Sequence, residues 1–463
     1  MTGQAVPSQG GHPLIEVRGL RVDYGLGPDA VHAVIDADLT LAAGAVLGLA
    51  GESGSGKSTL AYAMTRLLRA PGIITGGQVL LHGGTGPAGQ PPGAVNLLAA
   101  DEGQLRQLRW SAIAVVMQSA MHALNPVITV GAQLTDVLQA HRQQMSRTDR
   151  RERAAFLLEL VGISANHLRR YPHQLSGGMR QRVMIAMALA LEPAVVIMDE
   201  PTTALDVVTQ REILQELAGL QQELSFAVLF ITHDLSLLVE LADSIAVMYA
   251  GRLLEQAPAS DLYRAPRHPY TLGLLRSFPP LHGERRPLTG IPGSPPDLRT
   301  PPPGCPFHPR CGFAMDVCRA EVPVAIRLGR AGERSAACWL HDGTHDLPAD
   351  LAVPEPGTAP GRAAGTGPAG ATGTGPAGAA GTEPPGAAGT RPVAPGATAG
   401  TEPGAAPEPA ARTEAAAAPR PATGTESAAP RPATGTEPPA RRLAAATSLA
   451  EPTAAQDATR TRR

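Results

Sequence analysis

The run Gly51-Glu52-Ser53-Gly54-Ser55-Gly56-Lys57-Ser58 fits the pattern G-x-x-x-x-G-K-[ST], and the apolar stretch Ala45–Ala50 precedes it. Between a strand and a helix, this pattern forms a loop whose backbone N–H groups surround a phosphate. The helix N-terminus adds roughly half a positive charge. Lys57 would reach the β- and γ-phosphates, and the Ser58 hydroxyl would hold Mg²⁺. The sequence therefore predicts a nucleotide site formed by Gly51, Ser53, Gly54, Ser55, Gly56, Lys57, Ser58 and Thr59.

The basic residues of the chain support this interpretation. Lys57 is the only lysine among the 39 lysines and arginines. A compact ammonium fits inside a loop that wraps a phosphate, whereas a planar guanidinium does not. Every other basic residue of the chain is arginine, whereas the one position where this loop requires lysine has kept it.

On both sides of the loop, short β-branched runs alternate with helical stretches. This alternation predicts a mostly parallel sheet covered by helices, with ligands at the carboxyl ends of the strands. The stretch 133–182 is mainly helical and predicts a separate helical lobe. The expected strands are Ala45–Ala50, Ile113–Met117, Ala194–Met198, Ala227–Ile231 and Ser244–Tyr249, and the expected helices are Ser58–Arg69, Arg150–Val161, Gly177–Leu191, Val207–Glu223 and Leu235–Ala242.

Polar side chains follow two of these strands. Asp199 and Glu200 end the apolar run that begins at Val195, and His233 follows the run Val228–Ile231. At the ligand edge of the sheet, Asp199 would hold Mg²⁺ and Glu200 would act as general base toward water. His233 would contact the γ-phosphate. The alternatives are a simple acidic turn and a structural histidine.

The stretch Leu175–Arg182, LSGGMRQR, resembles the signature motif of ABC-type ATPases. The order of phosphate loop, Gln118, signature, Asp199-Glu200, Asp206 and His233 is similar to that of this family. The resemblance implies that Ser176, Gly177 and Gly178 contact the ATP of a second ATPase subunit, so that two subunits enclose two ATP molecules.

The same resemblance assigns three further positions. Gln118 looks like the glutamine that senses Mg²⁺, takes part in catalysis and faces the membrane partner. Asp206 looks like the aspartate at the seam of the ATPase dimer. Tyr24 looks like the aromatic side chain that stacks on adenine, although an exposed strand residue is the alternative.

Four stretches narrow the resemblance to the ATP-binding subunits of oligopeptide and dipeptide importers. The chain departs from the usual pattern at Trp110, Ser119 and His122, none of which touches phosphate chemistry. The four stretches are residues 121–126 (MHALNP), 200–207 (EPTTALDV), 267–271 (RHPYT), and 291–293 (IPG) leading to 304–311 (GCPFHPRC).

This resemblance implies a P-loop ABC-type nucleotide-binding domain of α/β class over residues 14–264, after a flexible start at 1–13. A small domain carrying all four cysteines is expected at 265–345, loop-like and apart from the sheet. Residues 346–463 are rich in Ala, Pro, Gly and Thr and repeat APRPATGTE at 418–426 and 429–437. Such a composition predicts a disordered tail.

The cysteines Cys305, Cys311, Cys318 and Cys338 are spaced C-x5-C-x6-C-x19-C. Four thiols in one small region suggest a set of metal ligands. The spacing lacks the close pair typical of zinc and differs from common ferredoxin spacings. The importer resemblance implies a [4Fe-4S] cluster. Zinc, free reduced thiols and disulfides in any of three pairings remain open.

Composition limits the possible functions. Acidic and basic residues number 41 and 39, giving a net charge of −2, which excludes the broad basic surface of a nucleic-acid binder. No run of about 18 apolar residues occurs, so no helix is expected to span a membrane. Residues 1–13 lack the pattern of a secretory signal.

The expected function is ATP hydrolysis, with Mg²⁺, that drives peptide import from the cytoplasmic face of the bacterial plasma membrane. The implied partners are a second ATPase subunit, two transmembrane permeases and an extracytoplasmic peptide-binding protein, and no nucleic acid. Three alternatives stay open: import of nickel or another small solute, a non-transport ABC ATPase in DNA repair, translation or iron–sulfur assembly, and an iron–sulfur regulatory protein.

Overall fold

The computed structural model describes residues 12–83, 93–118, 123–203, 205–277, 290–329, 333–344, 347–348 and 351. These residues lie within one compact unit, Met1–Gly367. Nearly all of the expected tail, with its repeats, lies outside the described residues, as do residues 1–11, Ser119 and residues 120–122.

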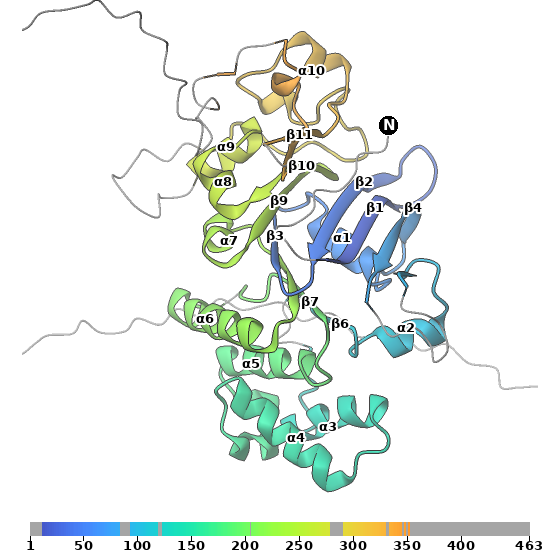
Figure 1. Ribbon diagram of the computed structural model, residues 1–463, viewed down its shortest axis with the longest axis vertical. Coiled ribbons are helices and arrows are strands. Elements are labelled where there is room, and N and C mark those ends of the chain that lie inside the picture. The colour runs from blue at the N-terminus through green and yellow to red at the C-terminus, as the bar shows by residue number, and fades with distance from the viewer. Residues whose placement is uncertain are drawn as a thin grey trace, which may run out of the picture. The chain divides into compact units, whose positions relative to one another are not determined.

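The larger of two sheets carries the predicted strands (Figure 1). Its strand order is β11-β12-β10-β9-β3-β8-β7-β6, and the five strands from β9 to β6 are parallel. Every residue of β3, β7 and β8 is buried, as expected for apolar strands covered on both faces. The bounds are β3 Val46–Ala50, β6 Ile113–Val116, β7 Val195–Asp199, β8 Ala227–Ile231, β9 Ser244–Tyr249 and β10 Arg252–Pro258.

A second sheet is antiparallel, in the order β2-β1-β4-β5. Sequence analysis did not predict it. Its inner face and one face of the large sheet enclose helix α1 in a shared apolar core, so both sheets fix the start of that helix. The bounds are β1 Pro13–Tyr24, β2 Val31–Ala42, β4 Gly72–Leu81, β5 Val95–Asn96 and α1 Lys57–Met64.

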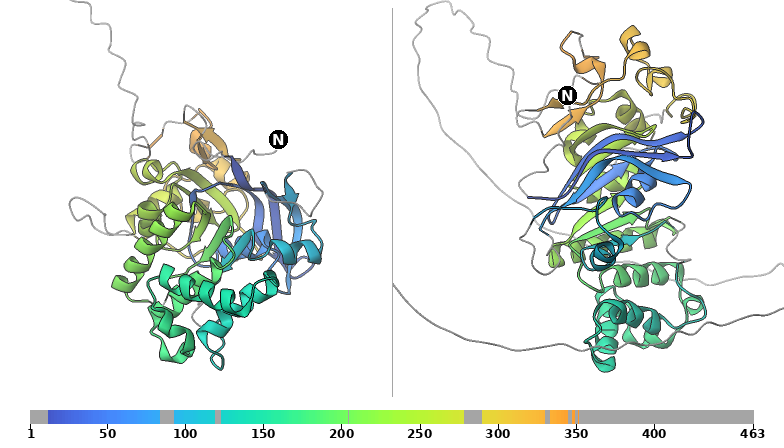
Figure 2. Two further views of the ribbon diagram at one scale, coloured as in Figure 1. Left: turned by 60° about the horizontal axis from the view of Figure 1, so that its bottom comes forward. Right: turned by 90° about the vertical axis from the view of Figure 1, so that its right-hand side faces the viewer.

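Helices α3, α4 and α5 form the predicted helical lobe. The lobe lies at the opposite end of the unit from α10 and the cysteine-containing segment in both views (Figure 2). The predicted helices are all present, and α6 and α7 cover the large sheet beside α5. The bounds are α2 Glu102–Leu108, α3 Val130–His141, α4 Arg147–Leu160, α5 Gly177–Ala188, α6 Val207–Leu224, α7 Leu235–Leu241, α8 Ala259–Arg264, α9 Pro269–Arg276 and α10 Asp316–Ala320, with 3-10 turns η2 Ala165–Arg169, η3 Pro172–Gln174, η4 His308–Arg310 and η5 Trp339–His341.

The expectation that the cysteine region stays apart from the sheet is wrong. Strands β11 (Ile326–Leu328) and β12 (Arg334–Ala336) extend the large sheet, because β12 pairs with the otherwise open edge of β10. The buried Glu255 of β10 accepts the backbone N–H groups of Arg267 (2.7 Å) and His268 (2.9 Å) and forms an ion pair with Arg334 at 3.6 Å. Residues 265–351, called the C-terminal segment below, therefore pair with the backbone edge of β10 and with the buried charge of Glu255.

None of the helices in the described part of the chain is long and apolar enough to cross a membrane.

Candidate nucleotide-binding site

The phosphate loop lies between β3 and α1, in the strand–loop–helix context that the motif requires. Two of its glycines have no substitute. Gly51 has a φ of 149°, and a Cβ there would lie 2.2 Å from the carbonyl oxygen of Met248. Gly56 has a φ of 103°, and its Cβ would lie 2.2 Å from the carbonyl oxygen of Ala33. The carbonyl groups of β9 and β2 thus leave no room for a side chain at these two loop positions.

Lys57 directs its ammonium group back into this loop. Its Nζ donates to the carbonyl oxygens of Gly51 (2.8 Å) and Glu52 (2.9 Å) and lies 3.4 Å from Ser55 Oγ. Burial lowers the pKa of Lys57, while the nearby carboxylates of Glu200, Asp199 and Glu52 oppose that shift. The single lysine of the chain is therefore a buried cation within reach of any phosphate that the loop holds.

The candidate magnesium ligands are in direct contact. Ser58 Oγ donates to Asp199 Oδ1 at 2.9 Å, and the Tyr62 hydroxyl donates to Asp199 Oδ2 at 2.9 Å. Burial raises the pKa of Asp199, and these two hydrogen bonds only partly offset it. A divalent cation beside Asp199 would stabilise its charge. Sequence reasoning missed Tyr62, although its spacing of four from Ser58 places both on one face of α1.

Glu200 is the centre of a second cluster at the same edge. Its Oε2 accepts hydrogen bonds from Gln118 Nε2 (2.9 Å) and Thr203 Oγ1 (3.0 Å), and its Oε1 lies 3.2 Å from His233 Nδ1. Burial would raise the pKa of Glu200, but its bonds to His233 and Thr203 outweigh burial and lower it. A carboxylate held in its charged form by several groups can accept a proton from a correctly placed water.

The cluster follows from the sheet topology. Gln118, Glu200 and His233 come just after β6, β7 and β8, which are neighbours in the parallel sheet. Glu200 itself has a φ of 45°, in the left-handed region that side chains seldom adopt. Backbone strain of this kind is concentrated at functional sites.

The signature residues and Asp206 lie elsewhere. Ser176 caps α5 by accepting from the N–H of Met179 (3.2 Å), and Asp206 caps α6 by accepting from that of Thr209 (3.0 Å). Within the described ranges, no hydrogen bond or ion pair joins Ser176, Gly177, Gly178 or Asp206 to the phosphate loop or to Glu200.

Tyr24 contacts helix α1, which follows the phosphate loop. It ends β1, and its hydroxyl lies 3.3 Å from Thr59 Oγ1. Both residues are half-buried, so the position is neither a fully exposed strand residue nor a core residue. The ring borders the start of α1, where the nucleotide is expected.

All four cysteines line one small cavity with His268, Phe307 and Trp339. Burial raises the pKa of Cys305 to about 11 and of Cys338 to about 12, and for Cys338 the three other thiols add to the shift. No disulfide joins the four thiols. Across the described residues, no group of three or more Cys, His, Asp or Glu side chains already has the arrangement of a metal site.

Comparison with known proteins places this geometry in a family. Residues 34–203 match the family model of the ABC transporter, and residues 254–318 match that of the oligopeptide/dipeptide transporter C-terminal region. A putative peptide import ATP-binding protein of Brucella melitensis is 44% identical over 322 residues, covering 67% of this chain and 93% of the relative. Two others are a dipeptide transport ATP-binding protein of Caldanaerobacter subterraneus subsp. tengcongensis (41% over 330 residues, covering 71% and 97%) and an oligopeptide transport ATP-binding protein of Salmonella typhimurium (42% over 320 residues, covering 68% and 92%).

Fold and motifs thus define an ATP-binding subunit of the ABC transporter class, with an ATPase domain. Within that class, the chain belongs to the family of peptide import ATP-binding proteins. The resemblance noted from the motifs is confirmed.

Proposed function

We propose that this chain binds MgATP in the phosphate loop and hydrolyses it to drive uptake of oligopeptides or dipeptides. ATP hydrolysis is supported by two groups of side chains that lie at one edge of the sheet beside Lys57. In the first group, Ser58 contacts Asp199. In the second, Glu200 is contacted by Gln118, Thr203 and His233. Peptides as the transported substrate are supported by the match to the oligopeptide/dipeptide transporter C-terminal region and by the names of the relatives.

Each group has a distinct role in this proposal. The loop N–H groups and Lys57 hold the phosphates, while Ser58, Asp199 and Gln118 hold Mg²⁺. Glu200 takes the proton of the attacking water, and His233, whose imidazole lies beside Glu200, contacts the γ-phosphate. Tyr24 stacks on the adenine ring.

The signature and Asp206 act in a dimer. Ser176, Gly177 and Gly178 start a helix whose N–H groups attract phosphate. Among the residues that the structure describes, no hydrogen bond joins them to the phosphate loop of their own chain. We place them against the ATP of a second ATPase subunit. The remaining partners are two transmembrane permeases and an extracytoplasmic peptide-binding protein, with this chain at the cytoplasmic face of the membrane.

The cysteine cavity fits a [4Fe-4S] cluster in its donor set. The four thiols line one small apolar space, and burial there raises the pKa of Cys305 to about 11 and that of Cys338 to about 12. A metal ion or cluster would stabilise the thiolate form of such groups. Cys305, Cys311, Cys318 and Cys338 would be the ligands, and the cluster would stabilise the fold of this segment. Iron and acid-labile sulfide in the anaerobically purified chain test it, because four of each per chain are expected, whereas bound zinc or metal-free thiols would overturn it.

Partner recovery tests the transport role. The tagged chain is extracted from host membranes in mild detergent without oxygen, and its co-purifying proteins are identified. Two permeases, a second ATPase and a binding protein that takes peptides are the expected set. A binding protein that takes nickel would change the substrate, and recovery with ribosomal, DNA-repair or cluster-assembly proteins would overturn the importer.

A further inference from the structure

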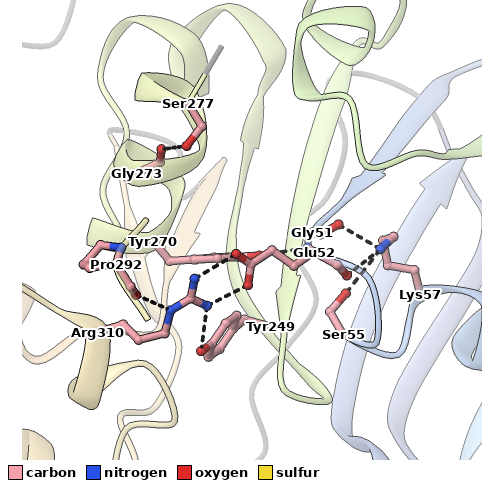
Figure 3. A network of polar contacts seen from close by, with 10 residues as sticks. All are labelled: Gly51, Glu52, Ser55, Lys57, Tyr249, Tyr270, Gly273, Ser277, Pro292 and Arg310. Atoms are coloured by element: carbon pink, nitrogen blue, oxygen red, sulfur yellow. Dashed lines mark hydrogen bonds and ion pairs between the residues drawn. The ribbon is translucent and has the colours of Figure 1, made fainter. Parts of the chain in front are cut away.

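Glu52, the second residue of the phosphate loop, is held by an arginine of the C-terminal segment. Glu52 accepts a two-pronged hydrogen bond from Arg310, whose Nη1 and Nη2 lie 2.7 and 2.9 Å from its carboxylate oxygens. Arg310 belongs to η4 and directly precedes Cys311. Figure 3 shows the guanidinium between the loop and the C-terminal segment. The two residues are 258 positions apart.

Arg310 is itself fixed in place. Its Nε donates to the carbonyl oxygen of Pro292 at 2.8 Å, and its Nη1 lies 3.2 Å from the Tyr249 hydroxyl. The guanidinium lies over the rings of Tyr249 and Phe307, and only 6% of the side chain is exposed. A guanidinium held by its neighbours loses little freedom when it binds a carboxylate.

A second C-terminal side chain holds the backbone of the same loop residue. The N–H of Glu52 donates to the hydroxyl of Tyr270 at 2.9 Å, and Tyr270 is fully buried in α9. The carbonyl of Glu52 accepts from Lys57. Glu52 therefore joins the phosphate-binding lysine to two residues of the C-terminal segment (Figure 3).

Electrostatics gives this contact a consequence for nucleotide binding. A carboxylate in the loop repels a bound triphosphate, and that repulsion is strong where the side chain is three-quarters buried. The bidentate arginine neutralises Glu52 and fixes the direction of its carboxylate. Without Arg310, Glu52 becomes an uncompensated anion that is free to turn toward Lys57.

We infer that Arg310 is a positioning residue for ATP: it orients and neutralises Glu52, so that the C-terminal segment completes the phosphate loop. This inference rests on the nucleotide site proposed above. It assigns the C-terminal segment a part in ATP affinity, separate from any metal at the cysteines.

The experiment measures MgATP affinity of the full chain by displacement of a fluorescent ATP analogue, together with KM and kcat. Arg310→Met should weaken ATP binding and raise KM about tenfold, with kcat changed less than twofold. Arg310→Lys should lie between, because an ammonium keeps the charge but not the fork. Arg299→Met is the matched control, since Arg299 is an exposed arginine of the same segment whose ion pair, among the described residues, is with Asp297.

A double-mutant cycle isolates the pair. Glu52→Gln removes the repulsive charge, so Arg310→Met in that background should change affinity less than about threefold. Unchanged ATP affinity in Arg310→Met, or an equal loss with and without Glu52→Gln, would overturn the inference. If Arg310→Met does not fold, Arg310→Lys and Glu52→Gln still decide the question. Wild-type chain that binds no ATP would overturn the proposed function as well, whereas a failure confined to the variants would leave that function standing.

Discussion

Glu200 is held by more partners than any other carboxylate of the site. Because Gln118, Thr203 and His233 contact its two oxygens, the carboxylate is already oriented before a water is bound. Its lowered pKa keeps it ionised at neutral pH, so it is ready to accept a proton. A general base contributes roughly 10²- to 10⁴-fold to a rate.

Glu200→Gln should therefore lower kcat by at least about 100-fold and leave ATP affinity within about twofold. The amide keeps the size of the side chain but cannot take the proton. Phosphate release and equilibrium binding of an ATP analogue measure the two effects. Glu212→Gln on the exposed face of α6 is the control, and turnover within tenfold of wild type would remove Glu200 from the role of base.

The Asp199→Asn variant separates the effect of the Asp199 charge on thermal stability from its proposed role in binding Mg²⁺. A raised folded-state pKa means that the folded protein binds this proton more tightly than the unfolded chain does, so the charge disfavours the fold once the pH exceeds the ordinary value of 3.8. Without nucleotide, the variant should melt about 2 °C higher at pH 7. That gain should shrink as the pH falls toward 4. The stabilisation by MgATP should disappear; a variant that keeps it would show that Asp199 holds no Mg²⁺.

The residues of the site were predictable to the extent that a local motif carries them. Ser58, Asp199 and Glu200 lie at fixed offsets from strand ends, so their positions at one edge of the sheet follow from the sequence. Arg310 and Tyr270 do not, because their contacts with Glu52 join positions more than 200 residues apart and depend on how the C-terminal segment folds back. Nothing in the local sequence around either residue indicates a phosphate loop.

At the scale of elements, α5 begins at a serine cap, and no hydrogen bond among the described residues joins its N-terminus to the phosphate loop. Ser176→Asp should keep the cap, since aspartate caps helices as well as serine does. It should also place a negative charge where the second subunit's ATP is expected. We expect ATPase activity to fall at least about tenfold while ATP binding to the variant's own loop stays within twofold.

Ser146→Asp at the cap of α4 is the matched control for that variant, because the serine there makes the same kind of bond to an N–H three residues on. Light scattering with ATP, on the hydrolysis-deficient Glu200→Gln background, reports on dimer formation. Unchanged ATPase activity in Ser176→Asp would remove the signature from the proposed dimer site.

Elements with one strong pattern were predicted correctly, and those with a mixed pattern were not. The apolar runs of β3, β7 and β8 favour short buried strands, because Val, Leu, Ile, Met and Phe dominate them. The strands β11 and β12 have three residues each and carry Arg327 and Arg334. Their assignment depends on the open edge of β10, which no local pattern records.

At the scale of the whole molecule, the edge of β10 makes the ATPase module depend on the C-terminal segment. A chain that ends at Arg264 loses the partners of Glu255 and leaves its charge unpaired. Loss of one partner of a buried ion pair costs about 3–5 kcal/mol. We expect this truncation to aggregate or to melt at least about 6 °C lower, as size-exclusion chromatography and thermal unfolding would show.

A chain ending at Leu351 is the control for that truncation. It keeps β12, and it keeps the carbonyl of Leu351 that accepts from Arg267 Nη1 at 3.2 Å. Its unfolding midpoint should match that of the full chain. If the chain that ends at Arg264 is as stable as the chain that ends at Leu351 and is also monomeric, the extension of the sheet by β11 and β12 is not needed for stability.

Because Lys57 is the single lysine of the sequence, it also limits how this protein can be labelled or immobilised through amines. Reagents that acylate or cross-link ε-amines find one such group in the entire sequence, and it lies against the carbonyls of Gly51 and Glu52. Any labelling of a lysine side chain in this sequence therefore occurs in the phosphate loop, and we expect bound MgATP to slow it beyond the effect of burial. For the same reason, fluorophores and surfaces that must leave ATP turnover intact have to be attached through other chemistry.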